Sequence, residues 1–383
     1  MPSLRFIPRL NNRRLLWIAA VLGFVMGAAL AVPLVVPGGY QTIEDIAKVF
    51  WSRHLRGGVH YRFNEIRPEY LAVDVERRIN VRTPAAIEAA RGRAIDAIWG
   101  EPGFPKERRP DRIEKDIRDP RLSGQPEVAH IDVLDIEMGQ GFRSRPHHLR
   151  PHRPNGKLVL YHEGHTGPFY RNAKVLLRLL ADGYDVVAFS MFIFDAQPVV
   201  DFPGIGPLHM DDFGRLAYLD HYLQYFFTPV ATALNHLLGT QTWRQVSMIG
   251  FSGGGWVTTV YAAIDPRIER SFPVAGTYPL YLRRYRNWGA PHETYPPLMR
   301  VANYLDLYIM GSHGPGRSQL QVLNQYDACC YSGFDWQTYE VPVQRAVREA
   351  GPGSFKVFLD SSHADHRLSN LGLDAIRAEL ARD

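Results

Sequence analysis

The sequence predicts an α/β protein in which a mainly parallel central sheet is flanked by helices. Of its 383 residues, 45% are apolar, enough to bury a large core and too many for a disordered or collagenous chain. From Glu127 onward, short β-rich runs alternate with helical ones, as parallel strands joined by helical crossovers do. The two cysteines, Cys329 and Cys330, are neighbours, which excludes a small scaffold held by several disulfides.

The net charge of +5 is concentrated at the start of the chain. Four arginines, Arg5, Arg9, Arg13 and Arg14, are the only charged residues before Glu44, so the remainder carries a charge of only +1. A nearly neutral folded part attracts phosphate weakly, and we expect no nucleic-acid partner.

Residues 15–36 form an uncharged, mainly apolar segment directly after the basic residues 1–14. Its 22 residues can cross a hydrocarbon core of about 30 Å as a helix. The positive-inside rule keeps 1–14 in the cytoplasm and places the folded part on the extracytoplasmic (periplasmic) side. Ala29-Leu30-Ala31 is an alternative cleavage site for a signal peptide, which would release a secreted protein. We favour the uncleaved membrane anchor.

Residues 37–126 are expected to form an N-terminal extension that packs on the main domain. Within it, Thr83 and Pro84 have the character of a helix cap and first helical residue, and Gly100 is expected to end that helix. The main domain then covers residues 127–383.

The main domain opens with an expected antiparallel pair, 128–136 and 142–149. Further strands are expected at 157–161, 185–190, 245–249, 268–274, 304–310 and 355–359, with helices near 170–182 and 371–382. Two long connections interrupt this alternation. The first, 192–243, should add a loop and helices interrupted at Pro229, and the second, 277–303, is rich in aromatic and arginine side chains.

The strongest local signal is Gly250-Phe251-Ser252-Gly253-Gly254, a G-x-S-x-G motif between an apolar strand and a helix-compatible run. A serine at such a sharp turn has strained backbone angles and neighbours that must be small, and its hydroxyl is raised above the sheet edge. The alternatives are a simple glycine-rich turn or a phosphate-binding loop, but the lysine of a P-loop is absent. The pattern therefore predicts a nucleophilic Ser252.

With this motif in this order of elements, Glu127 to Asp383 resembles the α/β-hydrolase superfamily, in its serine esterase and lipase-like branch. The resemblance implies hydrolysis of a carboxylic ester through an acyl-serine intermediate, with no metal or other cofactor. It also implies an oxyanion hole built from the N–H of Gly253 and from the loop after the third strand, at Gly164 or His165.

The same resemblance places the catalytic base after the last strand, where two histidines lie. We choose His366, with His363 as second choice. The acid is expected between serine and histidine in the sequence. Asp327 is the first candidate after the strand expected at 304–310, ahead of Asp335 and Glu293.

The aromatic side chains of the second connection suggest a sizeable substrate, a glycan or an aromatic ester held by stacking and cation–π contacts. The candidates are Tyr278, Tyr281, Tyr285 and Trp288. The alternative is that these rings pack a lid against the domain.

Three other functions stay open at this point. An acyltransferase would pass the same acyl-serine to an alcohol. A zinc hydrolase could use His162, His165, His363 and His366, although it would not need the serine motif. A non-catalytic binding protein could share the fold. The oligomeric state is not predicted.

Overall fold

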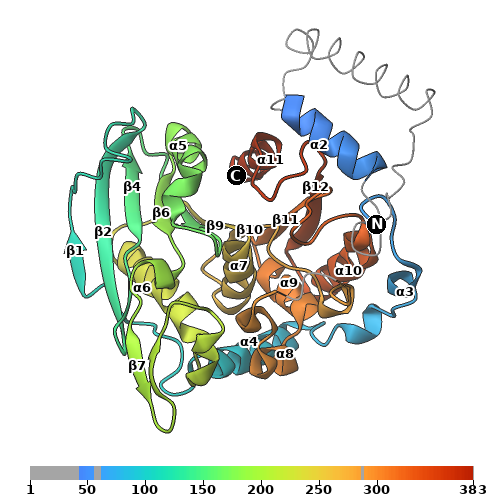
Figure 1. Cartoon of the computed structure of the whole chain (residues 1–383), viewed down its shortest axis with the longest axis horizontal. Coiled ribbons are helices and arrows are strands. Elements are labelled where there is room, and N and C mark those ends of the chain that lie inside the picture. Colours follow the sequence, from blue (N-terminus) through green and yellow to red (C-terminus); the bar gives the residue numbers. More distant parts are fainter. Residues whose placement is uncertain (1–42, 56–61, 286–288, 383) are drawn as a thin grey trace, which may run out of the picture.

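A ten-stranded sheet forms the centre of the described chain (Figure 1). The computed structural model describes residues 43–55, 62–285 and 289–382. Within them, the strands follow the order β1-β2-β4-β6-β5-β9-β10-β11-β12, and β3 pairs with β2 at the side. The pairings of β1 with β2, β2 with β4 and β4 with β6 are antiparallel. The remaining pairings along the sheet, from β6 through β5, β9, β10 and β11 to β12, are parallel. The predicted α/β class with a mainly parallel sheet is confirmed.

The strands have the following bounds: β1 Arg112–Glu114, β2 Val128–Gly139, β3 Phe142–Ser144, β4 His147–Pro151, β5 Lys157–His162, β6 Asp185–Phe189, β9 Gln245–Phe251, β10 Arg270–Val274, β11 Ser318–Asn324 and β12 Ser354–Asp360. A separate hairpin consists of β7 Val199–Phe202 and β8 Gly206–His209.

Helices cover both faces of the sheet (Figure 1). On one side lie α4 Pro84–Trp99, α6 Gln224–Thr240, α7 Gly253–Ile264, α8 Pro296–Val301, α9 Tyr304–Ser312 and α10 Glu340–Ala350. On the other lie α5 Ala173–Ala181 and α11 Asn370–Leu380. Two helices precede these, α2 Ile43–His54 and α3 Pro68–Leu71. Short 3₁₀ helices are η2 Glu76–Arg78, η3 Phe169–Asn172, η4 Phe192–Phe194, η5 Arg215–Tyr218, η6 Leu280–Leu282, η7 Pro291–Thr294 and η8 Asp335–Thr338.

The alternation of side chains in β5 shows how the sheet is buried on both faces. Leu158 and Leu160 belong to the apolar cluster under α6 and α7, while Val159 and Tyr161 belong to the cluster under α5 and α11. Because successive side chains of a strand point to opposite faces, a strand covered on both faces is apolar over most of its length, here from Leu158 to Tyr161. All six residues of β5 are buried accordingly.

Most expected elements are present. The opening strands form the antiparallel pair of β2 with β4, and the strands expected near 157, 185, 245, 268 and 355 are β5, β6, β9, β10 and β12. Thr83 caps α4 by accepting a hydrogen bond from the N–H of Ala86 at 3.2 Å, and the helix ends at Gly100. The interior of α4 packs into the main core cluster, so this part of the extension belongs to the same folded body.

Two expectations are wrong. Residues 304–310 lie in helix α9 rather than a strand, because Asn303 and Asp306 form a capping box that starts a helix there. The missing strand is β11, which follows that helix. Pro229 also does not interrupt a helix, since α6 continues through it from Gln224 to Thr240.

The predicted anchor, residues 15–36, lies outside the described residues. Among the helices of the described ranges, none has both the length and the apolar character needed to cross a membrane.

Candidate active site

The loops that carry the candidate residues leave the sheet at one edge. β5, β9, β11 and β12 are parallel members of the sheet, so their carboxyl ends point the same way. His162 ends β5, Phe251 ends β9, Asn324 ends β11 and Asp360 ends β12. In open α/β sheets this edge is where ligands bind.

Ser252 occupies a strained turn between β9 and α7. Its φ is 55°, a backbone conformation that residues with a side chain rarely adopt, and its N–H donates to the carbonyl of Val274 at 2.8 Å. A Cβ on Gly250 would lie 2.0 Å from the carbonyl oxygen of Gly254, and a Cβ on Gly254 would lie 2.0 Å from that of His162. Only glycine fits these two positions, which is the demand that the G-x-S-x-G motif meets.

Ser252, His366 and Asp327 form a continuous hydrogen-bonded chain. Nε2 of His366 lies 2.8 Å from Oγ of Ser252, and Nδ1 lies 2.6 Å from Oδ2 of Asp327. The side chain of Asp327 is fully buried, whereas that of His366 is 20% exposed. An imidazole held in this way can accept the serine proton on one nitrogen while a carboxylate holds the other.

The loop after β11 holds the carboxylate of Asp327 from several sides. Oδ1 accepts hydrogen bonds from the N–H groups of Cys329 at 2.7 Å and Cys330 at 3.2 Å. These two cysteines form a disulfide with each other. Asn324 Nδ2 lies 3.4 Å from Oδ2 and also donates to the carbonyl of Arg367 at 2.9 Å, which ties the acid loop to the histidine loop. Sequence reasoning missed Asn324, whose signal is its position at the end of β11.

His363 has a different partner from His366. It is fully buried, and its Nε2 lies 3.4 Å from Oδ2 of Asp360, at the start of the same loop. Although burial opposes the charged form, the nearby imidazole of His363 and hydrogen bonds from Ser362 and Ser369 lower the pKa of Asp360 to about 2. His363 therefore braces the loop, while His366 reaches Ser252.

The two alternative acids lie outside the hydrogen-bonded chain of Ser252, His366 and Asp327. Glu293 pairs with Arg283, whose Nη1 lies 3.3 Å from Oε2, and accepts a hydrogen bond from Tyr331. Asp335 lies in η8, and burial raises its pKa to about 7. The carboxylate that the structure brings to His366 is that of Asp327.

Gly164 lies directly beside Ser252. A Cβ on Gly164 would be 2.8 Å from Cβ and 3.3 Å from Oγ of the serine. Its own N–H donates to Oε1 of Glu163 at 3.0 Å. The other carboxylate oxygen of Glu163 accepts from Tyr161 at 2.9 Å and Asn172 at 2.8 Å, and burial raises the pKa of this acid. Glu163 thus shapes the loop and occupies one of the two expected oxyanion donors.

The four histidines proposed as zinc ligands do not converge. Within the described residues, the groups of three side chains suited to a metal are Cys329, Cys330 and His366, and His165, His292 and Glu293. In the first group the sulfurs are joined to each other. His162 instead stacks on Phe189, with ring centroids 5.8 Å apart, and burial lowers its pKa to about 4. The donor set required by the zinc alternative is not assembled.

The aromatic connection packs against the domain. Tyr278 is buried and its hydroxyl donates to the carbonyl of Ser332 at 3.3 Å. The hydroxyl of Tyr281 lies 2.7 Å from Oγ1 of Thr338, and the guanidinium of Arg67 lies 4.4 Å from the ring centre of Tyr285. Trp288 lies outside the described residues. The contacts of the three described rings are those of a connection packed on the domain, and Tyr278 is the one that is fully buried.

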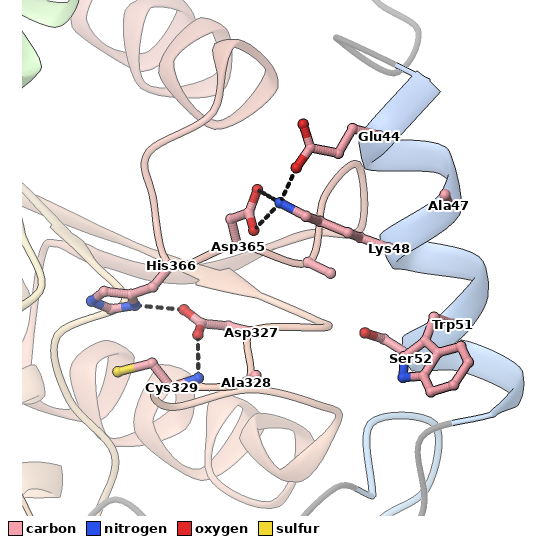
Figure 2. Close-up of a pocket in the computed structure, with 11 residues that line it drawn as sticks. Glu44, Ala47, Lys48, Trp51, Ser52, Asp327, Ala328, Cys329, Asp365 and His366 are labelled. Atoms are coloured by element: carbon pink, nitrogen blue, oxygen red, sulfur yellow. Dashed lines mark hydrogen bonds and ion pairs between the residues drawn. The ribbon is translucent and has the colours of Figure 1, made fainter.

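Helix α2 stands beside the triad and forms one wall of a cleft of about 560 Å³ (Figure 2). Lys48 of this helix pairs with Asp365 at 2.9 Å, and Asp45 pairs with Arg367 at 2.7 Å, so two ion pairs join α2 to the residues that flank His366. The opposite wall includes Asp327 and His366. The cleft therefore lies on the side of His366 that faces Asp327.

Comparison with known proteins places the fold. No protein-family model and no curated protein matches this sequence. Among solved structures, the methylesterase BT1017 is similar with a TM-score of 0.55 and 16% identity, over 78% of this chain and 63% of that one. An acetyl xylan esterase from a Paenibacillus species is similar with a TM-score of 0.50 and 15% identity, over 82% of this chain and 99% of that one.

This chain has the α/β-hydrolase fold, as the resemblance noted in the sequence implied. It spans less than two thirds of the methylesterase and nearly all of the acetyl xylan esterase.

Proposed function

We propose that this protein is an exported, membrane-anchored serine hydrolase that cleaves a carboxylic ester through an acyl-serine intermediate. The observation that carries the proposal is the hydrogen-bonded chain from Ser252 through His366 to Asp327 on a strained turn. The fold supports it, because the two structural neighbours are esterases by name.

The geometry supports a two-step reaction. Oγ of Ser252 attacks the ester carbonyl while Nε2 of His366 takes its proton, and Asp327 stabilises the imidazolium that forms. The N–H of Gly253, at the first position of α7, stabilises the oxyanion. His366 returns the proton to the leaving alcohol. In the second step, His366 takes a proton from water, the water oxygen attacks the acyl-serine, and the proton passes to Oγ of Ser252 as the acid is released.

An ester carried on a glycan is the substrate class that we propose. Its support is the acetyl xylan esterase, whose similarity extends over almost its whole length. Tyr278 of the second connection is buried and does not add to this support.

The test is hydrolysis of short-chain p-nitrophenyl esters and of acetylated xylan by the full chain in detergent. Ser252→Ala should abolish turnover, and Ser361→Ala, an exposed serine near His366, serves as the matched control. A chelator should leave wild-type turnover unchanged. Activity that survives in the Ser252→Ala variant but disappears with the chelator would overturn the serine mechanism.

Export is proposed from residues 1–36 alone. Protease added to intact cells after the outer barrier is opened should digest the hydrolase domain, while a cytoplasmic marker stays intact. Protection of the domain until the inner membrane is dissolved would contradict export.

A further inference from the structure

A disulfide joins Cys329 and Cys330 in the turn that presents the acid of the triad. The N–H of Cys329 donates to Oδ1 of Asp327 at 2.7 Å, and the N–H of Cys330 donates to the same oxygen at 3.2 Å. Because both groups point at one oxygen, the two successive peptide units must keep one mutual orientation. The other oxygen, Oδ2, is the one that meets His366.

The disulfide restrains this orientation. A bond between the sulfurs of adjacent residues closes a small ring that contains the peptide between them, and this peptide carries the N–H of Cys330. The ψ torsion of Cys329, which helps to set the angle between the two N–H groups, lies within the same ring. Once the bond is broken, these torsions regain their freedom, and conformational entropy opposes holding both donors on one oxygen.

The turn continues in a backbone conformation that needs support. Tyr331, the next residue, has a φ of 49°, a region that residues with a side chain rarely adopt. Conformations of this kind persist where the surrounding structure holds them. Residues 325–334, between β11 and η8, belong to neither a helix nor a strand, so no regular backbone ladder supplies that support.

The disulfide is accessible from solvent. Cys329 is exposed and lines the cleft beside α2, together with Asp327 and His366 (Figure 2). The chain has no other cysteine, so no second disulfide can rearrange with this one. A reductant that enters the cleft therefore acts on a single bond of the protein.

We propose that the Cys329–Cys330 disulfide is a positioning element of the active site, and that its reduction by a dithiol lowers turnover by releasing the donors that orient Asp327. The inference rests on the proposed serine mechanism. Asp327 orients His366 toward Ser252, so a small displacement of the acid affects the proton transfer. On the extracytoplasmic side proposed for this domain the bond persists, whereas a chain still in the cytoplasm would carry both thiols reduced and would turn over slowly.

The chemistry of the switch is thiol–disulfide exchange. A thiolate of the dithiol attacks Sγ of Cys329, the S–S bond breaks, and Cys330 leaves as a thiolate that takes up a proton. The second thiol of the reagent then attacks the reagent sulfur bonded to Cys329, closes the reagent's own disulfide and releases Cys329 as a thiol. Two electrons and two protons have then passed from the dithiol to the two cysteines.

Reversible reduction of the full chain tests the inference. The protein in detergent is treated with dithiothreitol and freed of it by gel filtration under argon, because free thiols cleave activated esters themselves. It is then assayed on a p-nitrophenyl ester with a chelator present. We expect kcat to fall by about 10- to 10²-fold, with KM changed by less than about 3-fold, and to recover on reoxidation. A protein with both thiols titrated that keeps the kcat of the oxidised form would overturn the inference.

The double variant Cys329→Ser/Cys330→Ser is the matched control, because it keeps both backbone donors and lacks the cross-link. Its kcat should equal that of reduced wild type, and dithiothreitol should not change it. The chelator is needed because the reduced cysteines and His366 offer ligand atoms within 4.8 Å of one another. A loss of turnover seen only without the chelator would show metal capture, and a loss accompanied by general unfolding, measured by tryptophan fluorescence, would show a structural role. Either result contradicts the positioning role.

Proton NMR separates this inference from the proposed function. The proton between Nδ1 of His366 and Asp327 should give a low-field signal that shifts or broadens on reduction. The same signal in the oxidised and reduced proteins would refute the effect on Asp327. Turnover that survives in Ser252→Ala, or an oxidised wild type without turnover, would instead overturn the proposed function, and the NMR comparison would still decide whether the disulfide holds the acid.

Discussion

Nδ1 of His366 lies 2.6 Å from Oδ2 of Asp327, although the two residues are 39 positions apart and come from the ends of different strands. The other oxygen of the carboxylate is fixed by the backbone of Cys329 and Cys330. The carboxylate is thus held at both oxygens, and the tautomer of His366 follows from that arrangement.

Asp327→Asn should lower kcat by about 10³- to 10⁴-fold, because an amide can hold the imidazole with its proton on the wrong nitrogen. Asp335→Asn is the matched control, and we expect its turnover to stay within about 3-fold of wild type. Steady-state kinetics on a p-nitrophenyl ester compare kcat of the two variants with that of wild type. Equal losses in both variants would contradict the assignment of the acid.

The two histidines of the loop after β12 should separate activity from stability. His366→Ala removes the group bonded to Ser252, so turnover should vanish with little change in Tm. His363→Ala leaves the buried Asp360 without the imidazole that lies 3.4 Å from its Oδ2 and should cost about 1–3 kcal/mol of unfolding free energy. Urea unfolding and ester hydrolysis of both variants check this. A His366→Ala protein that loses stability but keeps turnover, with a His363→Ala protein that loses turnover but keeps stability, would refute it.

Gly254→Ala should fail to form the turn around Ser252. The added Cβ would lie 2.0 Å from the carbonyl oxygen of His162, and backbone cannot yield as a flexible side chain can. We expect a loss of about 3 kcal/mol or more. Gly92→Ala is the control, because this exposed helical glycine has open space around it and should gain about 0.5–1 kcal/mol. Thermal melting compares the two, and a Gly254→Ala protein as stable and active as wild type would show that the turn can relax.

Acid should weaken the fold through Asp360. Its pKa in the folded state is about 2, below the ordinary 3.8, so its stabilising effect is present above pH 4 and is lost as pH falls toward 2. The shift corresponds to roughly 2 kcal/mol. Unfolding free energies of wild type and Asp360→Asn between pH 2 and 6 should converge at the acid end. A difference that is constant with pH would contradict this.

The sequence predicts correctly those elements whose structure depends on neighbouring residues. The turn at Ser252 follows from steric demands within five residues, and the strands of the sheet follow from continuous apolar runs. Residues 304–310 are equally apolar, and a short buried helix and a buried strand look alike by that measure. The signal that separates them is polar, since Asn303 followed three residues later by Asp306 starts a helix.

The rest of the site depends on contacts that no local pattern encodes. Asp327 reaches His366 even though the strand predicted before it is a helix, because β11 ends three residues earlier and fills the same role. Nothing near His292 in the sequence indicates that it meets His165, 127 positions away. The same is true of Tyr278, whose burial becomes evident only once the loop at Ser332 packs on it.

β12 pairs only with β11, within the described sheet, whereas the strand before Ser252 is hydrogen-bonded on both sides. Edge strands exchange their amide hydrogens by local opening more readily than central ones. Each opening of this edge would draw His366 away from a nucleophile that remains in place. The protein would then lose activity briefly and reversibly at temperatures well below its Tm. The temperature dependence of this loss would measure the free energy of local opening at β12 rather than the free energy of global unfolding.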